Sequence, residues 1–162
     1  MSVVLARVDN RLVHGQVLET WVPHVRADLI VVVGEAESRD PFRRSLFEAL
    51  STPRLRVEVV GPEEAQRIVS RDPARRVLVL FPDVAAAWAA FRAGLRFDRL
   101  NLGNVHPREG GQPVSRTVYL TEEDVEELRS LAAQGVELDV RAVPSDAAPP
   151  PETVLGNGGR SG

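Results

Sequence analysis

The chain has 162 residues, of which 43% are hydrophobic and 27% charged, and its formal net charge is -3 at pH 7. A chain of this size can bury a core of its own, and the composition is that of an ordinary globular domain. The negative net charge argues against non-specific nucleic-acid binding, which requires a basic surface. The absence of cysteine excludes disulfides, a thiol nucleophile and cysteine-bound zinc.

The sequence contains no pattern typical of membrane insertion. Its first residues lack the basic start and long apolar stretch of a secretory signal, and no apolar run approaches the roughly 20 residues that span a bilayer. We therefore expect a cytoplasmic protein, whose attachment to the inner membrane, if it has one, is made through partners.

Apolar runs and helical patterns alternate along the chain. The apolar runs predict strands at residues 3–8, 29–33, 55–60, 77–81, 99–102, 114–120 and 136–143. Apolar residues at helical spacing predict helices at residues 13–22, 41–50, 62–69, 83–93 and 121–134. This order predicts an α/β fold, an open and mainly parallel sheet of about seven strands with helices on both faces.

Two helix starts carry capping signals. Asp40 followed by Pro41 is typical of a capped first turn, and Thr121 with Asp124 resembles a capping box. The helix after Pro41 is expected to turn one apolar face to the core: Phe42, Leu46, Phe47 and Leu50.

The composition changes near the C-terminus. Three consecutive prolines at residues 149–151 and a glycine-rich stretch at residues 156–159 follow the last predicted strand. We therefore expect one domain at residues 1–146 and a flexible tail at residues 147–162.

The candidate chemistry is concentrated in residues 7–17, which have the sequence Arg-Val-Asp-Asn-Arg-Leu-Val-His-Gly-Gln-Val. The first predicted strand runs into this segment, so His14 follows the carboxyl end of a parallel strand, where α/β proteins bind ligands. Neutral imidazole is nucleophilic near pH 7 and can accept and pass on a phosphoryl group. Asp9 is the candidate that holds the other ring nitrogen and fixes the tautomer.

The neighbours of His14 can neutralise an anion. Arg7 and Arg11 supply positive charge and forked donors, and the backbone N–H groups of Gly15 and Gln16 stand at a predicted helix start. From spacing alone, however, a histidine after a strand is more often a surface or capping residue. For His24 and His106 we expect structural roles. The three histidines do not have the spacing of metal ligands, so we expect no metal and no cofactor.

Several segments together resemble one known family. Residues 7–17, followed by Trp21, are similar to the N-terminal signature of the IIB component of the mannose/sorbose family of bacterial sugar phosphotransferase systems. Residues 101–104 resemble the family's Asn-Val-Gly-Gly loop, residues 114–124 its next strand and helix start, and residues 135–138 and 143–146 its C-terminal strand and exit. The resemblance covers nearly the whole chain up to Asp146.

The resemblance implies a concrete activity. IIB components of this kind receive a phosphoryl group from a phosphohistidine on a IIA protein or domain and carry it on Nδ1 of one histidine, here His14. They pass it to a sugar that enters through IIC and IID membrane components, so the chain would be a protein-N(pi)-phosphohistidine–sugar phosphotransferase component. The sequence leaves open which sugar is used and whether the chain forms a homo-oligomer.

The chain also departs from the family pattern. Asn10 stands where the family commonly has a second aspartate, and Asn104, Val105 and His106 replace the more usual Gly-Met. These departures leave a second hypothesis open, a regulatory phosphocarrier or interaction module that signals through His14 without sugar transport. A nucleotide-binding protein is disfavoured because neither Gly-x-Gly-x-x-Gly nor a P-loop follows a predicted strand.

Overall fold

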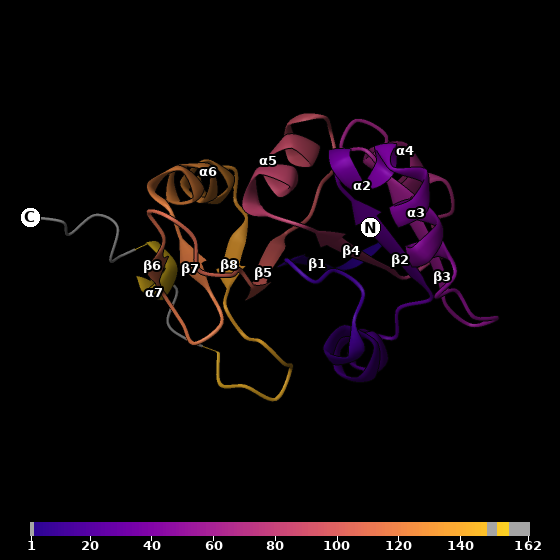
Figure 1. Ribbon diagram of the computed structural model, residues 1–162, viewed down its shortest axis with the longest axis horizontal. Helices are drawn as coiled ribbons and strands as arrows, with labels where there is room; N and C mark the ends of the chain where they lie inside the picture. The colour runs from indigo at the N-terminus through magenta and orange to yellow at the C-terminus, as the bar shows by residue number, and fades with distance from the viewer. Residues whose placement is uncertain (1, 149–151, 156–162) are drawn as a thin grey trace, which may run out of the picture.

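A computed structural model describes residues 2–148 and 152–155 (Figure 1). Its centre is a six-stranded sheet in which every pair of neighbouring strands is parallel, with the order β3-β2-β4-β1-β5-β8. These strands are β1 (Val3–Asp9), β2 (Leu29–Val33), β3 (Arg56–Val60), β4 (Val77–Phe81), β5 (Arg99–Asn104) and β8 (Glu137–Asp139). The predicted α/β class and mainly parallel sheet are confirmed.

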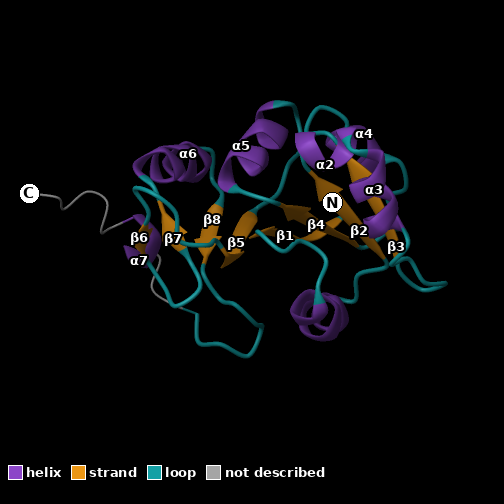
Figure 2. Cartoon of the chain, in the orientation of Figure 1, coloured by secondary structure: helices purple, strands orange, loops and turns teal. Residues whose placement is uncertain are grey.

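Helices connect the strands. The first begins at Gly15, has π-helical geometry in η1 (Val17–Trp21) and continues as α1 (Val22–Val25). The others are α2 (Glu35–Arg39), α3 (Pro41–Glu48), α4 (Ala65–Ser70), α5 (Val84–Arg92), α6 (Glu122–Ala133) and α7 (Glu152–Leu155). The η1–α1 helix lies on one side of the sheet, and α4, α5 and α6 lie on the other (Figure 2).

The alternation of side chains along the strands creates two cores. In β2, Val31 and Val33 pack with residues of α4, α5 and α6, whereas Ile30 and Val32 pack with the η1 residues Val17 and Trp21. All four β2 side chains are fully buried, as expected for a central parallel strand covered on both faces.

The predicted capping signals form as expected. The Asp40 carboxylate accepts hydrogen bonds from the backbone N–H groups of Phe42 and Arg43. The Thr121 hydroxyl accepts from the Asp124 N–H at 3.1 Å, and the Asp124 carboxylate accepts from the Thr121 N–H at 3.0 Å, which completes the capping box. These bonds satisfy N–H groups that the helices themselves leave without partners.

Two predicted strands differ in the structure. Residues 114–120 contribute no strand to the six-stranded sheet. Val118 makes a single parallel bridge to Val105, just beyond β5, and β7 (Tyr119–Leu120) pairs antiparallel with β6 (Gln112–Pro113). The last strand ends at Asp139 instead of residue 143. The main sheet therefore has six strands, and not about seven, because the β-rich pattern after β5 is used in this small ribbon.

The prediction for the apolar residues of α3 is largely wrong. Phe42, Leu46 and Leu50 are 71%, 55% and 42% exposed, and only Phe47 packs against the core. The helix lies beside the edge strand β3 (Figure 1). Among residues 2–148 and 152–155, no element covers its outer side, so helical spacing alone overestimated how many of these side chains are buried.

Part of the predicted tail is ordered. The short helix α7 contacts α6, and its Val154 is buried in the larger core. A flexible segment was expected here, so residues 152–155 depart from the prediction because one apolar side chain finds a place in the core. Residues 149–151 and 156–162 lie outside the described part of the chain. None of the helices in that described part is both long and apolar enough to cross a membrane.

Candidate functional site

The site forms where β1 ends between its neighbours β4 and β5. Asp9 is the last residue of β1, and the chain then turns sharply: the Leu12 N–H donates to the Asp9 carbonyl at 3.0 Å, with Leu12 at a φ of 57°. A left-handed leucine is strained by roughly 1–2 kcal/mol, but its side chain is almost fully buried and anchors the turn. The turn brings His14 back to face Asp9.

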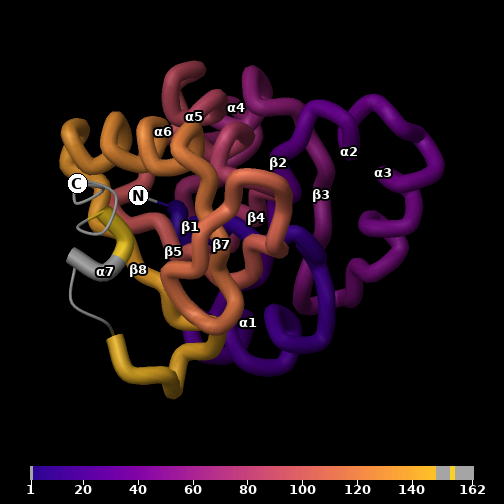
Figure 3. Tube along the Cα trace, turned by 60° about the vertical axis from the view of Figure 1, so that its left-hand side comes forward, coloured from indigo at the N-terminus to yellow at the C-terminus, as the bar shows by residue number. Residues whose placement is uncertain are grey.

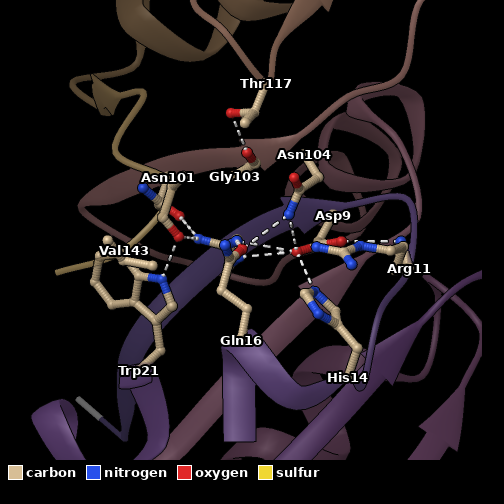
Figure 4. Close-up of polar contacts among 12 residues, drawn as sticks. Asp9, Arg11, His14, Gln16, Trp21, Asn101, Gly103, Asn104, Thr117 and Val143 are labelled. Carbon is tan, nitrogen blue, oxygen red and sulfur yellow. Dashed lines mark hydrogen bonds and ion pairs between the residues drawn. The ribbon is translucent and has the colours of Figure 1, made fainter. Parts of the chain in front are cut away.

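Asp9 is the polar centre of the site (Figure 4). It is fully buried, and its Oδ2 accepts hydrogen bonds from His14 Nε2 at 2.8 Å, from Asn104 Nδ2 at 2.9 Å and from the Arg7 guanidinium at 3.0 Å and 3.2 Å. Its Oδ1 accepts from the Arg11 backbone N–H at 2.9 Å. Burial alone raises the pKa of Asp9, but the bonds from His14 and Asn104 and the charge of Arg7 outweigh it, so the pKa is lowered and the carboxylate is ionised at neutral pH.

The contact with Asp9 distinguishes the two ring nitrogens of His14. An ionised carboxylate can only accept, so Nε2 carries the proton and Nδ1 keeps its lone pair. The His14 side chain is 14% exposed, which leaves the ring accessible from one side. His14 also begins the helix, since its carbonyl accepts the Leu18 N–H at 3.0 Å. The N–H groups of the first helical residues, beginning with Gly15, therefore have no carbonyl partner within the helix.

Arg7 does not point to solvent. It is completely buried beneath Asp9, and the pKa of its guanidinium is lowered by burial in spite of the Asp9 charge. All five of its N–H groups are accounted for by four acceptors, which are the Asp9 carboxylate, Asn101 Oδ1 at 2.8 Å, the Ala142 carbonyl at 2.9 Å and Gln16 Oε1 at 2.8 Å. The expectation that Arg7 itself donates to a phosphoryl group is therefore wrong, because no donor is left over. Its geometry is that of a residue that holds Asp9.

The other predicted site residues surround His14. Arg11 is exposed, and within residues 2–148 and 152–155 its guanidinium makes no hydrogen bond or ion pair. Gly15 is exposed at the helix start, with open space where a Cβ would stand. Gln16 is half-buried, and its Oε1 accepts hydrogen bonds from both Arg7 and Asn104. Its NH2 group therefore faces away from these two residues. The fold thus brings His14, Asp9, Arg7, Arg11, Gly15 and Gln16 into one site.

The segment after β8 lies on the same side of the sheet as the η1–α1 helix (Figure 3) and contacts it through Ala142. The Ala142 carbonyl accepts from Arg7 and, at 2.9 Å, from Trp21 Nε1. Asn101 links Arg7 to β8, because its Nδ2 donates to Asp139 Oδ2 at 2.8 Å. Trp21 is buried in the core and also fixes the carbonyl that holds Arg7.

Asn101, Gly103 and Asn104 belong to the site, although the sequence analysis did not name them as site residues. A Cβ on Gly103 would lie 2.0 Å from Arg7 Cζ, so only glycine fits beside the guanidinium. The two asparagines donate or accept inside the Arg7–Asp9 network. The available signal was the Asn-Leu-Gly-Asn run at the end of a predicted strand, where ligand sites of parallel sheets form.

The departure at Asn10 has a structural explanation. Its Nδ2 donates to the Pro82 carbonyl at 2.9 Å, and its Oδ1 accepts the His106 backbone N–H. Its own N–H donates to the Asn104 carbonyl at 2.9 Å. Asn10 thus ties the ends of β1, β4 and β5 together, and an aspartate could not make the bond to Pro82.

The side chains of the remaining two histidines do not bond to Arg7, Asp9 or His14. The His24 ring stands edge-on against Trp21 at 6.0 Å between centroids, and the exposed His106 contributes its backbone N–H to Asn10. Within the described residues there is no group of three or more His, Asp or Glu side chains arranged to hold a metal ion.

A separate cleft of about 1190 Å³ begins beside Asn10 and His106 and extends along the start of α6, without His14 in its lining. It is rich in carboxylates. Burial, together with the charges of Glu123, Asp124 and Asp83, raises the pKa of Glu127 there. Its lining includes His106 but neither His14 nor Asp9, so the cleft is distinct from the Asp9–His14 site.

Comparison with known proteins identifies the family. The family model described as PTS system sorbose subfamily IIB component matches residues 3–160. The chain belongs to this family. The family membership predicted from residues 7–17 and the later segments is thereby confirmed. The protein is a IIB component of the sorbose/mannose type, which is a phosphotransferase component of sugar transport.

Relatives and solved structures agree over most of the IIB chain. It is 31% identical to the sorbose-specific EIIB component of Lacticaseibacillus casei over 148 residues, covering 90% of both chains. It is 30% identical to the mannose-specific EIIAB component of Escherichia coli K12, covering 90% of this chain and 46% of that protein. The IIBSor domain of the sorbose permease from Klebsiella pneumoniae superimposes with a TM-score of 0.88 at 29% identity, covering 100% and 99% of the two chains.

Proposed function

We propose that His14 accepts a phosphoryl group on Nδ1 from the phosphohistidine of a IIA protein or domain and transfers it to a sugar during uptake through IIC and IID membrane components. The observation that carries the proposal is the 2.8 Å contact between His14 Nε2 and Asp9, which leaves Nδ1 as the nucleophile. One mannose-specific relative is named as an EIIAB component, a name that combines IIA and IIB, and this supports IIA as the donor.

Each transfer breaks one P–N bond and forms one new bond to phosphorus, a P–N bond in the first step and a P–O bond in the second. The Nδ1 lone pair of His14 bonds to phosphorus as the P–N bond to the donor histidine breaks, and that nitrogen recovers its electron pair. In the second transfer a sugar hydroxyl oxygen bonds to phosphorus, the electron pair returns to Nδ1, and the hydroxyl proton passes to solvent or a partner base. The proton stays on Nε2, hydrogen-bonded to Asp9, throughout both transfers, so Nδ1 is the atom that reacts in both steps.

The neighbouring residues stabilise the phosphoryl group. Because the charge of Arg7 is already paired with Asp9, the exposed guanidinium of Arg11 is the cation of this loop that remains for a dianion. The backbone N–H groups of Gly15 and Gln16 belong to the first turn of the helix, where unpaired N–H groups and the helix dipole favour an anion. The outward NH2 of Gln16 adds a donor whose orientation is fixed by Arg7 and Asn104.

A labelling series tests the acceptor. The chain contains three histidines, so His14→Ala, His24→Ala and His106→Ala are each incubated with phosphoenolpyruvate, the general phosphotransferase proteins and a cognate IIA. We expect acid-labile label in the wild type and in the His24 and His106 variants, and none in His14→Ala. Heteronuclear NMR of the phosphoprotein should place phosphorus on Nδ1. Label that persists in His14→Ala, or that resides on Nε2, would overturn the assignment.

A second experiment separates transport from regulation. Labelled protein is added to membranes that contain IIC and IID, with and without sugar. Sugar-dependent loss of the label, with formation of sugar phosphate, is expected for a transport component acting at the cytoplasmic side. Label that stays on the protein under all sugars tested would favour the regulatory phosphocarrier instead.

A further inference from the structure

Asn104, at the end of β5, contacts Asp9 directly, and the proposed function does not use this contact. It is 7% exposed, and its Nδ2 donates to Asp9 Oδ2 at 2.9 Å and to Gln16 Oε1 at 3.0 Å. Its backbone carbonyl accepts the Asn10 N–H. The amide is held at both N–H groups, so it cannot turn away from Asp9 (Figure 4).

The important point is that Asn104 and His14 donate to the same oxygen. Asp9 Oδ2 receives both of them as well as Arg7, while Oδ1 receives only the Arg11 backbone N–H from the described residues. Donors on one carboxylate oxygen compete for its electron density. Each bond from Asn104 or Arg7 stabilises the ionised carboxylate and makes it a weaker acceptor for the His14 N–H.

We propose that Asn104 is a positioning residue that sets, through Asp9, how strongly the Nε2–H of His14 is held, and therefore how readily the phosphoryl group leaves Nδ1. The inference rests on the proposed role of His14. A phosphohistidine carries more positive charge on its ring than the free imidazole, so a weaker acceptor at Asp9 stabilises it less. When the P–N bond breaks, the electron pair returns to Nδ1, and the proton stays on Nε2, where Asp9 accepts its hydrogen bond.

The Arg7 charge cannot replace this effect, because it is fixed by its own five N–H contacts and is present whether or not Asn104 donates. Burial has the largest effect on the pKa of Asp9 and raises it. Of the causes that lower this pKa, the bond from His14 is the largest and the bond from Asn104 is the next. Removing the Asn104 amide therefore changes the carboxylate while the remaining charges around it stay in place.

The test uses Asn104→Ala with Thr117→Val as a matched control. Thr117 supports the same loop, since its hydroxyl donates to the Gly103 carbonyl at 2.7 Å, but it does not touch Asp9. In the unphosphorylated protein, NMR measures the titration of the Asp9 carboxyl carbon and the proton shift of His14 Nε2–H. We expect Asn104→Ala to raise the pKa of Asp9 and to move the Nε2–H signal downfield. Thr117→Val should change neither.

The phosphorylated protein provides the second readout. The equilibrium constant for transfer from His14 to the IIA histidine should fall roughly three- to tenfold in Asn104→Ala, the range expected when a hydrogen bond to a charged group is lost and only part of it is transmitted. Amide spectra of both variants establish that the chain is folded.

Two results would overturn the inference. One is an Asp9 titration and a His14 signal in Asn104→Ala that match the wild type, and the other is a Thr117→Val variant that shows the same changes. If wild-type His14 takes no phosphoryl group, the proposed function fails, and the NMR measurements still decide whether Asn104 acts on Asp9.

Discussion

Gly103→Ala introduces a single methyl group at the most crowded point of the site. The new Cβ would stand 2.0 Å from Arg7 Cζ, 2.2 Å from Nη2 and 2.4 Å from Nη1. Ordinary contact begins at 3.4 Å, so the guanidinium must retreat by about 1.4 Å, the difference between 3.4 Å and 2.0 Å. Its bonds to Asn101, Ala142 and Gln16, now 2.8–2.9 Å, cannot all survive such a shift.

The expected cost follows from burial. Overpacking a core by a methyl group costs about 1–3 kcal/mol, and each lost hydrogen bond to a buried charge adds about 1.5–3 kcal/mol. Because relaxation recovers part of this sum, we expect a loss of about 3–5 kcal/mol, similar to breaking a buried ion pair. With an m-value near 2 kcal/mol/M, the urea midpoint should fall by roughly 1.5–2.5 M.

Urea unfolding of Gly103→Ala beside Gly61→Ala tests this reasoning. A Cβ at Gly61 meets its nearest atom, Ser38 Oγ, at 3.5 Å, so the control should stay within about 0.5 kcal/mol of the wild type. Phosphorylation of His14 in the Gly103 variant should slow as well, because Arg7 no longer holds Asp9 in place. A Gly103→Ala protein with wild-type midpoint and wild-type labelling would refute the claim that this glycine is required by Arg7.

Three further predictions concern other polar groups. Asn10→Asp places a carboxylate oxygen against the Pro82 carbonyl that Nδ2 now reaches at 2.9 Å, and should cost about 1–3 kcal/mol in urea unfolding; an unchanged midpoint would show that Asn10 does not bridge the loops. The pKa of Asp9 is lowered in the folded state, so its stabilisation is present above the ordinary carboxyl pKa and is lost as the pH falls toward the folded value. Asp9→Asn should therefore be less stable at pH 7 and show a shallower loss of stability in acid, and a parallel pH profile would contradict this. The pKa of Glu127 is raised, chiefly by burial, so folding is weakened as the pH rises through its titration. Glu127→Gln should be more stable than the wild type at pH 7 by thermal unfolding, whereas a lower melting temperature would rule out this effect.

The sequence predicted the parts of the fold that depend on local patterns. Continuous apolar runs found the buried strands, since a strand covered on both faces has no polar positions. The capping box at Thr121 and Asp124 was read from two residues because both of its bonds are local. The pairing of Asp9 with His14 was likewise anticipated, because a five-residue separation after a strand end brings the two side chains into one turn.

The errors arose where distant segments decide the outcome. Phe42 and Leu46 have the spacing of core residues, but whether anything covers that face of α3 depends on the packing of the whole chain. Residues 114–120 have the alternation of a strand, but β8 pairs with β5 along residues 99–101. The segment therefore meets this edge only beyond β5, at the single bridge of Val118 to Val105.

The sequence by itself determined the fold class and the family, and it predicted His14 as the reactive histidine, because apolar periodicity and a contiguous motif encode them locally. The tertiary structure decided the role of each charge around that histidine. Arg7 could have faced solvent, but Asn101 and Ala142, which lie 94 and 135 residues away in the chain, take up its donors and turn it into a support for Asp9. Its removal from solvent leaves Arg11 as the exposed cation of the motif, since a buried guanidinium with every N–H bonded has nothing left to offer a ligand.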